Sequence, residues 1–130
     1  MGYIGNLDRN KKLLRPHLHL AIHGMRDEGN VDIEIGTLHG KTCSPEVKEW
    51  FVSEIKKHFR RIQIDGRFPG DSSKPAHRCG DKISDTEYLG YGNNFNTFQV
   101  EISRTLREKN QKELIDIFSN IILKYISEFK

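Results

Sequence analysis

The chain has 130 residues, of which 35% are hydrophobic and 30% charged, and its net charge is +3 with the histidines neutral. This composition is typical of a folded globular domain and excludes wholesale disorder. The basic residues are mixed with 18 acidic ones, which argues against a nucleic-acid-binding patch, and no apolar run is long enough to span a bilayer. With only two cysteines, Cys43 and Cys79, a disulfide framework is not expected. We therefore expect one cytoplasmic domain over residues 1–130.

The first predicted elements are two strands that follow a lead-in over residues 1–16. Residues 17–23 alternate, with Leu18, Leu20 and Ile22 on one side and His17, His19, Ala21 and His23 on the other. Residues 31–35, VDIEI, repeat the pattern with an aliphatic side chain at every second position. Each strand is therefore expected to have one apolar and one polar face.

A helix is predicted over residues 44–61, followed by a short strand in RIQID at 61–65. Ser44 is a favourable N-cap, and Pro45 suits the first helical position. Apolar residues recur near four-residue spacing and form the stripe expected to be buried: Val47, Phe51, Ile55, Phe59 and Ile62.

Residues 65–94 are rich in Gly, Pro, Asp and Ser and show little periodicity. Loops of this length are uncommon in compact domains unless they are functional or disordered. The aromatic and charged residues in the segment favour a functional loop, and we expect an irregular lid that borders a site.

The last predicted elements are a strand over residues 97–103 and a helix that begins after Asn110. In the strand, Phe98, Val100 and Ile102 alternate with polar residues. Glu113 follows Asn110 by three positions, which resembles a capping box. Strands that alternate with helices predict an α/β fold with a mixed, partly parallel sheet flanked by helices.

Three residue types that suit hydrolysis lie at or near predicted strand ends. His23 closes one strand, and Glu101 and Arg104 lie at or just past the end of another. Ligands bind at the carboxyl ends of strands in open α/β sheets. A zinc ligand, a base for the bound water and a cation for an anionic substrate would suit metal-assisted hydrolysis.

The same residues could instead have purely structural roles. A histidine at a strand end is often a hydrogen-bonded structural residue. Glu101 could instead pair with Arg104 or Arg107. His17 and His19 form a His-x-His pair, which on a strand can bind zinc.

Four motifs occur in the order and rough spacing of the N-formylglutamate amidohydrolase family: LAIHGM, DIEIGT, FPGD and FQVEISRTLR. Residues 17–107 resemble the C-terminal portion of that family's catalytic domain. The resemblance implies a shortened zinc-carboxypeptidase-like (phosphorylase/hydrolase-like) fold. The chain differs from the family in having Ala21 two residues before the histidine, where Asp is frequent, and in having a shorter N-terminal part.

The resemblance implies a zinc-dependent amidohydrolase that cleaves an N-acyl amino acid, for example an N-formyl one, or a related amide. Glu101 would be the catalytic carboxylate and His23 a zinc ligand, and Arg104 or Arg78 would hold a substrate carboxylate. The resemblance leaves the remaining ligands unassigned, and we expect His19 among them, with His17 and His77 as alternatives. The alternative function is a non-catalytic remnant or split subunit that binds a small anion or a partner chain. Because a shortened sheet exposes an edge, a homo-oligomer or a complementing chain is expected.

Overall fold

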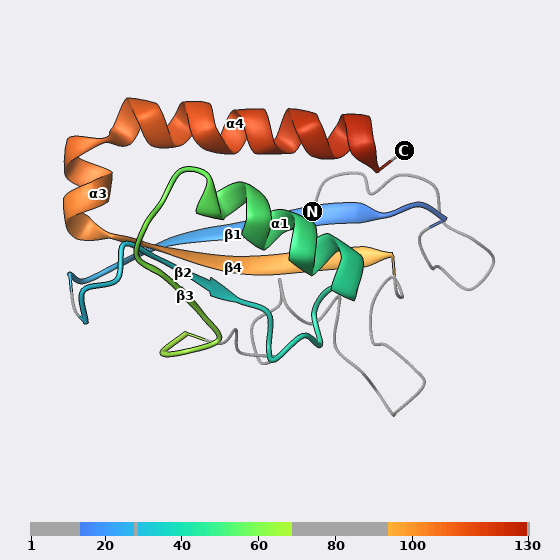
Figure 1. The fold of residues 1–130 in the computed structure, drawn as a ribbon, viewed down its shortest axis with the longest axis horizontal. Helices are drawn as coiled ribbons and strands as arrows, with labels where there is room; N and C mark the ends of the chain where they lie inside the picture. The colour runs from blue at the N-terminus through green and yellow to red at the C-terminus, as the bar shows by residue number, and fades with distance from the viewer. Residues whose placement is uncertain (1–13, 28, 69–93, 130) are drawn as a thin grey trace.

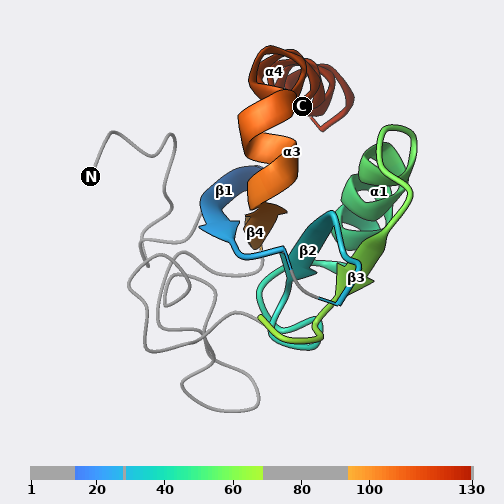
Figure 2. The same ribbon diagram turned by 90° about the vertical axis from the view of Figure 1, so that its left-hand side faces the viewer.

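The structure is a computed structural model that describes residues 14–27, 29–68 and 94–129. These residues form a four-stranded sheet with helices against one of its faces (Figures 1 and 2). The elements in chain order are β1 (His17–Met25), β2 (Ile33–Gly36), α1 (Pro45–Lys56), β3 (Ile62–Ile64), β4 (Phe95–Ser103), α3 (Arg104–Lys109) and α4 (Gln111–Glu128).

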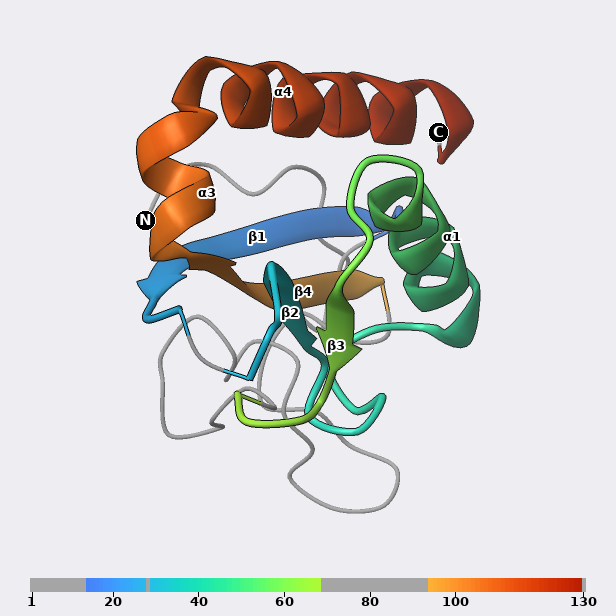
Figure 3. The same cartoon turned by 60° about the vertical axis from the view of Figure 1, so that its left-hand side comes forward.

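The sheet has the strand order β1-β4-β2-β3 (Figure 3). β1 runs parallel to β4, and β2 runs parallel to β3, whereas β2 and β4 are antiparallel. The predicted mixed, partly parallel sheet is therefore confirmed. The link to a zinc-carboxypeptidase-like fold stays a prediction.

The core lies between the sheet and the helices α1 and α4. Phe98 at the centre of β4 is fully buried and stacks on Phe51 of α1, with ring centroids 4.3 Å apart. The core combines strand and helix residues: Ile33, Ile35, Val47, Phe51, Ile55, Phe59, Phe98, Val100, Ile102, Leu114, Ile117, Phe118, Ile121 and Tyr125. We call the face of the sheet that packs against this core the apolar face.

Helix α1 begins as predicted and ends earlier. The Ser44 side chain accepts a hydrogen bond from the Val47 backbone N–H, and Pro45 occupies the first helical position. The helix stops at Lys56, although the apolar stripe continues to Phe59. The chain must turn there because the Arg61 carbonyl accepts a hydrogen bond from the Asp32 N–H at 2.8 Å, beside the start of β2. Pairing between β2 and β3 thus overrides the helical periodicity.

Helix α3 was not predicted by the sequence pattern. The Ser103 side chain accepts a hydrogen bond from the Leu106 N–H at 3.3 Å, so the last residue of β4 is also the N-cap of α3. Asn110 then leaves helical geometry, with φ −126° and ψ 31°, and separates α3 from α4. The predicted lid at 65–94 lies almost wholly outside the described residues and stays untested. Among the described residues, no helix combines the length and the apolarity that crossing a membrane requires.

Candidate functional site

The side of the sheet that faces away from α1 and α4 carries most of the polar residues of the strands. We call it the polar face and define it by His19, His23, Glu34, Thr97, Gln99 and Glu101. It exists because every second residue of a strand points to the same side. β4 shows the split most clearly, since its Phe98, Val100 and Ile102 enter the core on the other side.

His23 and Glu101 are direct partners in the parallel ladder between β1 and β4. Partners in register point to the same side of a sheet, so both side chains lie on the polar face. The two residues therefore lie on adjacent strands near the carboxyl ends of those strands, and the convergence of their side chains on one pocket stays a prediction. His23 is exposed, whereas only 6% of Glu101 is. Their assignments as zinc ligand and general base stay predictions.

The Glu101 carboxyl is held in surroundings that favour its protonated form. Burial raises the pKa of Glu101, and the negative charge of Glu34 raises it further. The charge of His23, a hydrogen bond from Gln99 Nε2 at 3.0 Å and the charge of Arg107 act in the opposite direction. Burial outweighs them, so the pKa lies above the ordinary range. A carboxyl with a raised pKa is a candidate acid–base group.

Glu34 is a residue of the polar face that the sequence reasoning did not single out. It lies directly across from Glu101 in the antiparallel ladder between β2 and β4, and only 1% of it is exposed. Its carboxylate accepts a hydrogen bond from the Phe68 N–H. The signal was present in VDIEI, because a carboxylate at an alternating position of a strand belongs to its polar side.

Of the two arginines that the sequence offered as partners of Glu101, it is Arg107 whose charge acts on the carboxyl. Arg107 donates hydrogen bonds to the carbonyl oxygens of Ile102, at 3.1 Å, and Met25, at 3.2 Å. It thereby joins the carboxyl ends of β1 and β4. Arg104 instead forms an ion pair with Glu108 at 2.8 Å, and 70% of its side chain is exposed. A role for Arg104 in substrate binding stays a prediction.

Gly24 allows this arrangement next to His23. A Cβ atom at Gly24 would come within 2.5 Å of the Arg107 guanidinium carbon. The small residue therefore lets the arginine cross the end of β1.

His19 and His17 lie farther along β1. The His19 ring nitrogen Nδ1 is 2.9 Å from the Thr97 hydroxyl, its neighbour in register. His17 stacks on Phe95, and burial lowers its pKa. His19 precedes His23 by four residues, about 13 Å along a strand. The two imidazoles therefore occupy different parts of the polar face.

The described residues do not by themselves make up a zinc site. Within residues 14–27, 29–68 and 94–129, no three histidine, cysteine or carboxylate side chains are grouped so as to hold a metal ion. A catalytic zinc normally has three protein ligands. The predicted ligands His23 and His19 stay predictions, and Arg78 and His77 lie outside the described residues.

The turn after β2 borders the His19 end of the polar face. Leu38 and His39 have φ values of 49° and 55°, which non-glycine residues rarely adopt. Thr42 anchors the turn to β4, since its hydroxyl donates to the Thr97 carbonyl at 2.7 Å. Asp65 accepts hydrogen bonds from the Thr37 N–H and hydroxyl. The strained turn is thus fixed to β4 and to Asp65, the residue that follows β3.

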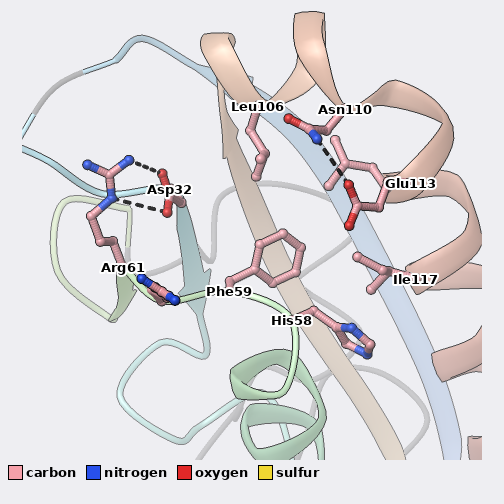
Figure 4. Close-up of a pocket in the computed structure, with 10 residues that line it drawn as sticks. Asp32, His58, Phe59, Arg61, Leu106, Asn110, Glu113 and Ile117 are labelled. Atoms are coloured by element: carbon pink, nitrogen blue, oxygen red, sulfur yellow. Dashed lines mark hydrogen bonds and ion pairs between the residues drawn. The ribbon is translucent and has the colours of Figure 1, made fainter.

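A cavity of about 540 Å³ lies on the helical side, away from His23 and Glu101 (Figure 4). Apolar side chains such as Phe59 and Ile117 form part of its wall. Arg61 and Asp32 form an ion pair at 2.6 Å at its edge. None of the described residues that line the cavity is a predicted site residue, so we place the candidate site on the polar face.

The sequence matches no protein-family model, and no curated protein or solved structure matches it either. The resemblance to the N-formylglutamate amidohydrolases therefore rests on the four motifs and stays a prediction.

Proposed function

We propose that the protein hydrolyses the amide bond of an N-acyl amino acid or a related amide, with Glu101 as general base. The observation that carries the proposal is the register of His23 with Glu101 on neighbouring parallel strands. The raised pKa of the buried Glu101 adds to it. The motifs shared with the N-formylglutamate amidohydrolases suggest the substrate class.

In the proposed reaction, the Glu101 carboxylate accepts a proton from a water molecule while the water oxygen adds to the amide carbonyl carbon. The same carboxyl then delivers that proton to the amide nitrogen, and the carbon–nitrogen bond breaks. The products are a carboxylic acid and a free amine. A raised pKa suits both steps, because it strengthens the base and makes the acid form easier to reach.

Only the resemblance to the N-formylglutamate amidohydrolases suggests that zinc takes part. Among the described residues, His23 and Glu101 are adjacent potential metal ligands, but no third such side chain is grouped with them so as to hold a metal ion. No step above is therefore assigned to zinc. If zinc does bind, His23→Ala is expected to lower the metal content of the purified protein more than a substitution at the exposed His58 does.

The test is amine release from a panel of N-formyl, N-acetyl and longer N-acyl amino acids, using full-length protein without a histidine tag. We expect turnover of at least one substrate by the wild type and loss of that turnover in Glu101→Gln. Glu49→Gln, at an exposed position of α1, is the matched control for the same chemical change. Equal turnover by wild type and Glu101→Gln would reject the assigned base, and no turnover of any substrate would reject the function.

A second candidate function is a non-catalytic subunit that binds a small anion or a partner chain. The absence of a three-ligand metal group from the described residues favours it. A wild type that binds an N-acyl amino acid by calorimetry, but holds no metal and releases no amine, would support this alternative.

A further inference from the structure

An apolar groove runs between helix α4 and the face of β1 that carries Leu18, Leu20 and Ile22. The proposed reaction does not use this surface. It has a volume of about 700 Å³. Ile22 is 50% exposed, Ile122 43% and Ile126 61%, and all three line the groove. Leu18 and Leu20 of β1 continue this surface. Exposed aliphatic residues that cluster in this way mark an interaction surface.

The groove coincides with an edge of the sheet. β1 is the outermost strand in the order β1-β4-β2-β3, so no described strand pairs with its outer side. It is nine residues long, whereas β3 at the other edge has three residues. A long edge strand presents a row of backbone donors and acceptors to which another strand can pair.

One side of α4 has a stripe that faces away from α1. Ile115, Ser119, Ile122 and Ile126 fall within roughly 60° of one another around the helix, at 3.6 residues per turn. Lys124, on the opposite side, bonds to Glu54 of α1 at 3.2 Å, which fixes the direction of the stripe. Ile115 and Ile126 are 60% and 61% exposed.

The spacing of this stripe is the same in both directions along the helix: four residues, three, then four. When two such helices pack antiparallel around a twofold axis, Ile115 meets Ile126 of the other copy. Ser119 meets Ile122 of the other copy, so a small side chain faces a large one. A surface that complements itself under a twofold rotation is what a symmetric dimer requires.

We propose that this surface is the dimer interface between two copies of this chain. A twofold axis perpendicular to the sheet would pair β1 with β1 of the second copy in antiparallel fashion, forming an eight-stranded sheet. α4 lies above β1 and β4 (Figure 2), so the same rotation brings the two α4 helices together on one side of the joined sheet. A single twofold axis can place the two β1 strands about 4.8 Å apart and the two α4 helices about 8–10 Å apart.

The expected contact area reaches the size that a stable dimer needs. Nine strand residues and eighteen helical residues are each on the order of 30 Å long. A sheet layer and a helix layer together are about 20 Å high, which gives about 600 Å² per copy and about 1,200 Å² in total. That is the lower end of the range for specific interfaces.

The test is the molar mass of the full-length protein by sedimentation velocity across a concentration series. We expect a dimer for the wild type and a dissociation constant at least about tenfold weaker for Ile122→Glu, since central apolar anchors dominate such interfaces. Leu123→Glu is the matched control, because Leu123 is 63% exposed on the same helix and does not line the groove. It is expected to stay dimeric.

A cross-link tests the same surface if Ile122→Glu fails to fold. The double variant Ser119→Cys with Ile122→Cys is expected to form a covalent dimer on mild oxidation, whereas Leu123→Cys is not. A wild type that stays monomeric throughout the series would overturn the proposal. So would equal weakening by the two glutamate variants, or copurification of a different polypeptide that occupies the groove in place of a second copy.

Discussion

The two faces of the sheet differ in what their side chains contact. On the apolar face, residues such as Phe98 and Val100 are fully buried against helices α1 and α4. On the polar face, Glu101 is almost as well buried, yet it contacts Gln99 and lies in register with His23 and Glu34. One strand therefore contributes to the core and to the candidate site through successive residues.

Burial has opposite consequences on the two faces. Burial of an aliphatic or aromatic side chain stabilises the fold in proportion to the area removed from water. Burial of a carboxyl disfavours its charged form and raises its pKa, as it does for Glu101. Substitutions on the apolar face should therefore change stability, whereas substitutions on the polar face should change protonation and chemistry.

The largest expected effect is on activity, in Glu101→Gln. If the protein is an amidohydrolase, loss of the general base should lower kcat by a factor on the order of 10² to 10⁴. The folded state should persist, because the two side chains have similar size. Steady-state amine release measures the first effect and thermal unfolding near neutral pH the second. A variant that loses activity because it unfolds would contradict the division between the faces.

Phe98→Ala should have the largest effect on stability. The ring is fully buried and stacks on Phe51 of α1, and its removal leaves a cavity in the core. The free energy of unfolding should fall by about 3–5 kcal/mol, as measured by urea denaturation. Thr97→Ala, at the neighbouring position on the polar face, is the comparison, and an equal loss there would remove the distinction.

Gly24→Ala should destabilise the protein by about 1–2 kcal/mol, because the added methyl group displaces the Arg107 guanidinium. The arginine then loses its hydrogen bonds to the carbonyl oxygens of Met25 and Ile102. In an Arg107→Ala background the same change at Gly24 should cost much less. A double-mutant cycle by denaturant unfolding measures this coupling, and additive effects would show that the two residues act independently.

The stability of the wild type should depend on pH through Glu101. Its pKa is raised in the folded state, so between the ordinary glutamate pKa and the raised one the folded protein binds more protons than the unfolded one. The free energy of unfolding should therefore fall as pH rises through this window. Glu101→Gln should lack that decrease when its unfolding is followed over the same pH range. A parallel decrease in both proteins would assign it to another group.

The smallest expected effect is on the pKa of Glu101 in Glu34→Gln. The substitution removes a negative charge that raises this pKa, while an amide oxygen can still accept the Phe68 N–H. The pKa should move down towards the ordinary range, as followed by NMR titration of the Glu101 side-chain carboxyl. A shift upwards would show that Glu34 influences Glu101 mainly through packing.

Local patterns in the sequence predicted much of the fold. The alternation in residues 17–23 and 97–103 located β1 and β4 and separated their apolar from their polar sides, although β1 extends to Met25 and β4 begins at Phe95. Ser44 and Pro45 fixed the start of α1. These features were predictable because they depend on backbone geometry and on neighbours a few residues away in the chain. The end of α1 and the existence of α3 were not predicted, since each depends on where β2, β3 and β4 come together.

The sequence by itself determined that a histidine and a carboxylate occupy polar strand positions, at His23 and Glu101. Only the tertiary structure decided that they are direct neighbours, that Glu34 lies on the other side of Glu101, and that Arg107 is the arginine beside it. The physical reason is that strand order and register join residues that are tens of positions apart, through backbone hydrogen bonds that any residue but proline can make. Such pairing leaves little trace in local periodicity.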